Sequence, residues 1–201
     1  GLEVLFSVDS DINQCIRLGV DALIAPMVET PFALSKYVNS VSPDENIKLL
    51  FVCESKTAYQ NLKDILSTEE AKRLSGVVVG RSDFCKSNSL SKSKVDCASV
   101  CKEVEEILTL AKSHDLVTTM GGNISTKSVK FIKSMYEAGY LDKIETRNVI
   151  IELTPDNITK LDTVIQDVLS FEISWLKYKS QRYSEVSDEC IYRAGLLESR
   201  R

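Results

Sequence analysis

Two acidic residues, Glu54 and Asp83, follow closely on short apolar runs that are typical of buried strands. The first run, residues 48–53, ends immediately before Glu54, and the second, residues 76–79, ends shortly before Asp83. In parallel α/β folds, ligands bind at the carboxyl ends of strands, and neighbouring strands lie about 4.8 Å apart. The two carboxylates can therefore converge on one hard cation, because Mg²⁺ takes one or two protein carboxylates and keeps other positions for water or substrate. The alternative is that each carboxylate caps the helix that follows it.

The other candidate site residues follow the ends of the same predicted strands. Two glycines before a capped helix start, at residues 121–125, could hold a phosphate or carboxylate or could simply form a tight turn. The predicted substrate-binding residues are Glu29, Gly80, Arg81, Ser82, Gly121 and Gly122; Arg81 is also predicted as catalytic, and Glu29 has helix capping as its alternative.

An alternation of apolar runs and amphipathic stretches positions these residues. Such a pattern is typical of strands buried on both faces of a parallel sheet and joined by helices. Residues 86–96 are polar and are predicted to form a mobile loop. The predicted strands are 22–27, 48–53, 76–79, 116–120 and 148–153, and the predicted helices are 11–18, 31–41, 57–66, 95–113, 125–138, 158–179 and 187–197.

The predicted fold class is α/β, a TIM-barrel-like (β/α) repeat that lacks the first strand or strands of the barrel. Five strands, or six with an apolar run at residues 2–7, are too few for eight, so residues 1–201 are predicted to form a single partial domain, with an open sheet as the alternative. Residues 1–6 read GLEVLF, which is either a protease-cleavage tag remnant or a native strand. The C-terminal helices, residues 158–201, are candidates for oligomerisation, and Trp175 is expected to be an oligomer or core anchor.

Composition argues against several classes of protein. Hydrophobic residues make up 43% and charged residues 27%, as in ordinary globular proteins, and the formal net charge of −4 gives no electrostatic case for binding nucleic acid. No apolar run reaches the roughly 18 residues of a membrane-spanning helix, and no secretory signal is visible. The 6 cysteines lack a disulfide-rich pattern, which indicates a reduced, cytoplasmic protein, and the single histidine argues against a Cys/His zinc site.

Three short motifs carry a resemblance to a known family. Residues 25–30 read APMVET, residues 54–57 read ESKT, and residues 79–84 read VGRSDF. Together they resemble the HpcH/HpaI aldolase and citrate lyase β-subunit family, because they occur in the family's order and at suitable spacing. The resemblance extends over roughly residues 11–176.

The resemblance implies a modified TIM barrel and an enzyme, a carbon–carbon lyase or aldolase. Such an enzyme acts on a small 2-oxo acid or acyl thioester through a metal-stabilised enolate. Glu54 and Asp83 match the family's glutamate and aspartate, which bind Mg²⁺ or Mn²⁺. The resemblance further implies that the backbone of residues 80–83 could bind the substrate carboxylate and that Arg81 is a candidate catalytic group and anion contact, with a surface salt bridge as its alternative. The family usually forms homo-oligomers and often exchanges a C-terminal helix between subunits, which here would be residues 161–179.

Departures from the family pattern leave other functions open. The family commonly uses an arginine from an early strand, and its aldolase branch uses a histidine–aspartate base pair; this chain is expected to begin after that segment. His114 precedes the strand at 116–120 and would lie at the wrong end of the barrel. The alternatives are a non-catalytic metal-binding, ligand-binding or assembly protein, and a phosphate-binding barrel that uses residues 121–125. Glu145 and Arg147 are predicted to form a surface ion pair.

Overall fold

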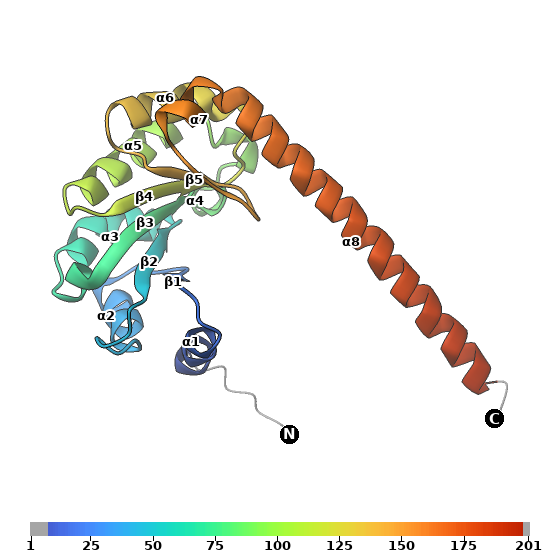
Figure 1. Cartoon of the computed structure of the whole chain (residues 1–201). Coiled ribbons are helices and arrows are strands. Elements are labelled where there is room, and N and C mark those ends of the chain that lie inside the picture. The colour runs from blue at the N-terminus through green and yellow to red at the C-terminus, as the bar shows by residue number, and fades with distance from the viewer. Residues whose placement is uncertain (1–7, 199–201) are drawn as a thin grey trace.

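The computed structural model describes the backbone of residues 8–198 and the side chains of residues 11–192, so the predicted tag or strand at residues 1–7 lies outside it. Six strands form one sheet in chain order, as Figure 1 shows. The first five strands pair in parallel, and the sixth pairs antiparallel with the fifth. The strands are β1 (Ala22–Ala25), β2 (Lys48–Cys53), β3 (Leu74–Gly80), β4 (Val117–Gly121), β5 (Lys143–Glu145) and β6 (Ile150–Glu152).

Helices join the strands and pack along the outer side of the sheet (Figure 1). The α-helices are α1 (Val8–Arg17), α2 (Pro31–Asn39), α3 (Lys56–Leu66), α4 (Arg81–Ser87), α5 (Ala98–Lys112), α6 (Val129–Glu137), α7 (Pro155–Thr159) and α8 (Leu161–Glu198). Short 3₁₀ turns are η1 (Glu70–Arg73), η2 (Lys92–Lys94) and η3 (Thr126–Ser128). This alternation of parallel strands and helices confirms the predicted α/β repeat.

The two faces of the sheet differ in exposure. On β2 every second residue is fully buried against the helices, whereas the residues between them are only partly buried or exposed. The strand register extends this second row to Ile24 of β1 and Val117 of β4, which are 44% and 39% exposed. In a closed barrel such residues would fill the interior. The sheet is therefore a half-barrel with an open concave face, which confirms the predicted partial TIM barrel.

Capping residues fix the starts of the helices that follow β1 and β2. Thr30 caps α2 by accepting a hydrogen bond from the backbone N of Ala33 at 3.1 Å, and Pro31 occupies the first helical position. Ser55 caps α3 in the same way, with its hydroxyl 3.0 Å from the backbone N of Ala58. The strand β2 has the predicted bounds. These contacts fix the chain on both sides of the carboxyl ends of β1 and β2.

One prediction about the middle of the chain is wrong, and one strand was not predicted. Residues 86–96 are not one loop, because they contain the end of α4 and the turn η2, where the Ser91 hydroxyl accepts from the backbone N of Ser93. The strand β5 was not predicted, because its three residues contain a single buried apolar side chain, Ile144. The predicted strand at 148–153 is the antiparallel strand β6.

The C-terminal region is one continuous helix rather than the two predicted. The first turns of α8 are anchored to the body, since Leu161 and Ile165 are fully buried and the Glu172 carboxylate accepts hydrogen bonds from Thr146 Oγ1 and Asn148 N, both at 2.8 Å. Beyond Glu172 the helix runs away from the sheet (Figure 1). Its exposed large apolar and aromatic side chains are Phe171, Ile173, Trp175, Leu176, Tyr178, Tyr183, Val186, Ile191 and Tyr192. No helix in the described part of the chain is both long and apolar enough to cross a membrane.

Candidate active site

Four residues form a row across the carboxyl ends of β2 to β5. Gly80 of β3 pairs with Gly121 of β4. One step beyond the printed pairs of the flanking strands, Glu54 lies beside Gly80, and Glu145 lies beside Gly121. Because residues in one register row of a parallel sheet point to the same face, the two glutamates and two glycines share the concave side of the sheet. This edge is where ligands bind in folds of this class.

Glu54 is held from both sides. Its Oε1 accepts a hydrogen bond from the backbone N of Met27 at 3.1 Å, and Met27 adopts a left-handed backbone with φ of 56° that is uncommon for a residue with a side chain. On the other side, a Cβ at Gly80 would lie 2.9 Å from the Glu54 Cβ and 3.2 Å from Oε2. Glycine at position 80 therefore leaves the room that the Glu54 side chain occupies.

Burial raises the pKa of the Glu54 carboxyl, the hydrogen bond from Met27 partly offsets this, and the negative charge of Asp83 raises it further. The influence of Asp83 is felt because both carboxylates lie at the same end of the sheet. Asp83 sits in the first turn of α4, its side chain is 53% exposed, and its Oδ1 is 2.6 Å from the Lys86 Nζ. The convergence of Glu54 and Asp83 on one cation stays a prediction.

The two carboxylates fit a hard divalent cation. Mg²⁺ and Mn²⁺ prefer oxygen ligands, and Mg²⁺ is commonly held by one or two protein carboxylates. Within the described side chains, no group of three or more His, Cys, Asp or Glu is placed to hold a metal ion. A metal site here would therefore depend on Glu54 and Asp83, with the remaining positions open to water or substrate.

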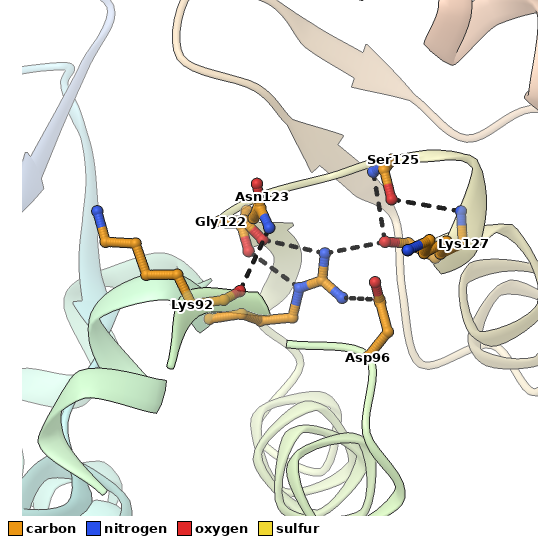
Figure 2. A network of polar contacts seen from close by, with 9 residues as sticks. Lys92, Asp96, Gly122, Asn123, Ser125 and Lys127 are labelled. Atoms are coloured by element: carbon orange, nitrogen blue, oxygen red, sulfur yellow. Dashed lines mark hydrogen bonds and ion pairs between the residues drawn. The ribbon is translucent and has the colours of Figure 1, made fainter. Parts of the chain in front are cut away.

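Arg81 is turned into the protein rather than toward a ligand. Its side chain is 0% exposed, and NH1 donates to Asp96 Oδ1 at 2.8 Å. Nε donates to the Gly121 carbonyl at 3.2 Å, and NH2 donates to the Gly122 carbonyl at 3.1 Å and to Ser128 Oγ at 3.2 Å; Figure 2 shows this network. Burial lowers the pKa of Arg81, and Asp96 opposes that change. The geometry therefore disfavours the predicted substrate contact and catalytic role, and also the surface salt bridge, and makes Arg81 a positioning residue.

The loop after β4 rests directly on the start of α4. A Cβ at Gly122, whose φ is +84°, would lie 2.5 Å from the backbone N of Ser82 and 2.8 Å from that of Arg81. Ser125 and Ser128 form a reciprocal capping box at η3, so the polar groups there are already engaged. This arrangement favours a tight turn over the predicted phosphate site at residues 121–125. The predicted substrate contacts of Ser82, Gly121 and Gly122 stay predictions.

Glu29 supports its neighbours. Its carboxylate accepts a hydrogen bond from the Ser55 hydroxyl, and its carbonyl accepts from Asn61 Nδ2 at 2.8 Å. Because Thr30 caps α2, Glu29 does not fill the capping role that was its alternative. His114 lies in the connection between α5 and β4, at the opposite end of the sheet from Glu54, as predicted.

Glu145 was misassigned from the sequence. It is the last residue of β5 rather than part of a surface ion pair, and within the described chain no ion pair joins it to Arg147. Its side chain lies across Gly121, where an added Cβ would be 2.8 Å from both Cγ and Oε1. Burial raises the pKa of its carboxyl. The only sequence signal was its position after Lys143 and Ile144, too short a run to indicate a strand.

Comparison with known proteins agrees with this architecture. A family model described as HpcH/HpaI aldolase/citrate lyase matches residues 6–139. Among solved structures, a variant of the citrate synthase SbnG has a TM-score of 0.56 at 16% identity, covering 85% of this chain and 69% of that chain. An HpcH/HpaI aldolase/citrate lyase family protein from Burkholderia cenocepacia J2315 has a TM-score of 0.57 at 16% identity, with 82% and 70% covered.

RipC from Yersinia pestis is also similar, with a TM-score of 0.54 at 14% identity, covering 78% of this chain and 69% of that chain. At these identities the likeness to solved structures shows the fold alone. No match to a curated protein sequence is found.

Proposed function

Since the chain belongs to the HpcH/HpaI aldolase/citrate lyase family, we propose that it is a divalent-metal-dependent lyase that breaks or forms a carbon–carbon bond. The proposed substrate is a small 2-oxo acid or an acyl thioester. The observation that carries this proposal is the placement of Glu54 and Asp83 at one end of the sheet, close enough for the charge of Asp83 to raise the pKa of Glu54.

In this proposal Glu54 and Asp83 hold Mg²⁺ or Mn²⁺. When bound, the ion supplies positive charge that stabilises negative charge developing on a substrate oxygen. The Oε1 of Glu54 is oriented by Met27, and Asp83 is half-exposed beside the same edge, so both carboxylates are open to solvent ions. Lys86 would give up its exposed ion pair with Asp83, which costs little because solvent screens such pairs.

The substrate would lie on Gly80 and Gly121. These two residues are neighbours in the register and form a glycine floor, over which the side chains of Glu54 and Glu145 lie. Arg81 would act indirectly, because its bonds to the carbonyls of Gly121 and Gly122 hold the loop that borders this floor.

The enclosed guanidinium of Arg81 favours a second candidate function. A substrate anion at this edge would not contact the positive charge of Arg81, which is buried. The chain could therefore bind metal or ligand without turnover, as a non-catalytic member of the family. The two candidates differ in a measurable way, because only a lyase releases a cleaved product.

The metal site is tested by thermal unfolding with and without Mg²⁺ or Mn²⁺. Saturation at about 100 times the dissociation constant stabilises the fold by about 2.7 kcal/mol, so the melting temperature should rise. Glu54→Ala and Asp83→Ala should abolish the rise, whereas Glu152→Ala, an exposed glutamate on β6, should keep it. A wild-type melting temperature that changes with neither Mg²⁺ nor Mn²⁺ would contradict the proposed site.

Turnover is then measured as metal-dependent release of pyruvate from oxaloacetate and from 4-hydroxy-2-oxo acids. Release that Glu54→Ala abolishes would support the lyase. Metal binding without release from any of these substrates would favour the non-catalytic candidate.

We also propose that the chain forms a homo-oligomer through α8. The helix leaves the body after Glu172 and carries apolar and aromatic side chains that are 41–68% exposed, including Trp175, Leu176 and Ile191. A second copy of this chain would bury them. Light scattering should give a mass above the 22.4 kDa of one chain, and Leu176→Asp with Ile191→Asp should reduce it, whereas Ser180→Asp should not. A monomeric wild type would overturn this part of the proposal.

A further inference from the structure

Glu145 lies at the end of β5, at the same edge of the sheet as Glu54, and its carboxylate holds no other described residue in place. Within the described residues, its side chain makes no hydrogen bond and no ion pair, in contrast to Glu29, Glu54 and Asp83. It is nevertheless partly buried, and its carboxylate is not sealed from solvent, because no buried side-chain oxygen in the described chain lacks a partner. Burying a carboxylate without a partner is unfavourable, and such groups are common at functional sites.

The direction of the side chain is defined by Gly121. Glu145 projects from β5 across the end of β4, so that Oε1 would be 2.8 Å from a Cβ at position 121. From the other side, Glu54 lies against Gly80 at the end of β3. The two glutamate side chains therefore lie over two adjacent glycines, Glu54 over Gly80 and Glu145 over Gly121.

The two carboxylates have different surroundings. Glu54 feels the like charge of Asp83, which a shared cation would relieve, and its Oε1 accepts a hydrogen bond from the backbone N of Met27, which suits a fixed metal ligand. Glu145 belongs to no group of three or more potential metal ligands among the described side chains, and it has no partner that fixes its charge. The row therefore has a carboxylate suited to metal binding at its β2 end, Glu54, and a carboxylate without a hydrogen-bond or ion-pair partner in the described chain at its β5 end, Glu145.

We propose that Glu145 is the acid–base catalyst of this site, which transfers the proton at the substrate carbon next to the carbonyl group. The inference depends on the proposed lyase function and adds a residue for the proton transfer. In the bond-forming direction, a Glu145 oxygen takes the proton, the C–H electron pair becomes the carbon–carbon double bond, and the carbonyl π pair moves to oxygen. In the cleavage direction, the protonated Glu145 returns that proton to the same carbon, so atoms and charge balance.

The surroundings of Glu145 suit this role. A general acid–base group works best when its pKa lies near the working pH, and burial shifts that of Glu145 upward, in the required direction. The Glu145 side chain lies over Gly121, and no hydrogen bond or ion pair within the described residues ties its carboxylate to another group. A substrate on the glycine floor would place its reacting carbon beside Glu145 while its oxygens face Glu54.

The test is exchange of the methyl protons of pyruvate in D₂O with Mg²⁺, followed by proton NMR. Wild type should exchange them, and Glu145→Gln should slow exchange by about 100-fold or more, the usual contribution of a general base. The calorimetric affinity for pyruvate and the melting-temperature response to Mg²⁺ should remain at wild-type values, which a merely structural role would not predict. The matched control is Glu152→Gln, which lies on the same sheet but is exposed, and it should exchange normally.

A second variant tests the position of the carboxylate. Gly121→Ala places a methyl group where the Glu145 side chain lies, so the side chain must move while the metal ligands stay in place. Exchange should fall while the response to Mg²⁺ persists.

The outcomes separate the two proposals. Equal exchange by wild type and Glu145→Gln would overturn the role of Glu145 and leave the lyase function standing. A wild type that binds Mg²⁺ and pyruvate but exchanges no protons would contradict the lyase function itself, and the role of Glu145 with it.

Discussion

Two polar groups at the same edge of the sheet are built in opposite ways. The first, centred on Arg81, is closed: four hydrogen bonds from one enclosed guanidinium join Asp96, Ser128 and two backbone carbonyls. The second, formed by Glu54, Asp83 and Glu145, is open, since its carboxylates are partly exposed and two of them have raised pKa values. Closed groups stabilise the scaffold, whereas open groups retain unused capacity for a ligand.

The largest effect should come from breaking the closed group. Arg81→Ala leaves Asp96 without its ion pair and removes the donors to the carbonyls of Gly121 and Gly122. Loss of one partner of a buried ion pair typically costs about 3–5 kcal/mol, and urea denaturation should show a loss of this size. The control is Lys86→Ala, which removes an exposed, solvent-screened ion pair and should leave the free energy of unfolding almost unchanged. Similar losses for both variants would contradict the contrast between closed and open groups.

A smaller loss should follow from Gly122→Ala. The added Cβ meets the backbone N of Ser82 at 2.5 Å in addition to the strained φ of +84°. Gly139→Ala is the matched control, because Gly139 has a φ of +75° but no atom within 4 Å of an added Cβ. The left-handed backbone alone costs about 1–2 kcal/mol, so Gly122→Ala should exceed Gly139→Ala by the cost of the backbone clash. Equal denaturation midpoints would show that the loop does not press on α4.

The smallest change in stability, a gain rather than a loss, should come from replacing Glu145 in the open group. Burial raises the folded-state pKa of Glu145 above its unfolded value, so the folded state binds this proton more tightly. The resulting stabilisation is present below the unfolded pKa of about 4.3 and is lost as pH rises through the folded value. Glu145→Gln should therefore be slightly more stable than metal-free wild type at pH 7, and the difference should disappear at low pH.

Asp142 provides the opposite case in the same measurement. Although burial raises its pKa, hydrogen bonds from Lys112 and Thr118 hold it below its ordinary value overall. This contribution is present above the unfolded pKa and is lost as pH falls through the folded value. Asp142→Asn should therefore be less stable than wild type at pH 7. If Glu145→Gln and Asp142→Asn change the free energy of unfolding in the same direction at pH 7, the opposite pKa shifts of these two carboxyls are contradicted.

Features set by local sequence were predictable. The apolar run Lys48–Cys53 gave the bounds of β2, and Pro31 after the capping residue Thr30 gave the start of α2. With the strand order known to be parallel, the position of Glu54 after β2 follows. The half-barrel, and the edge of the sheet at which Glu54 lies, could therefore be inferred from the sequence.

Features set by distant contacts were not predictable. Whether Arg81 faces a ligand or the interior depends on carbonyls 40 and 41 residues away along the chain. The strand β5 is held by pairing with β4 and β6 rather than by its own three residues, so Glu145 could not be placed. Periodicity also gave no reason to join the last two predicted helices, because the outer part of α8 has no body to pack against.

The length of α8 has a consequence for how the molecule opens. A helix of 38 residues extends about 57 Å, and only its first turns, as far as Glu172, are anchored. The outer turns should therefore exchange their amide hydrogens in a gradient that is fastest toward the C-terminal end and independent of unfolding of the sheet. Slower hydrogen exchange of the outer α8 amides at higher protein concentration would show that the chains associate through this helix. A rearrangement of the sheet would not produce the same change, because these turns do not pack on the sheet.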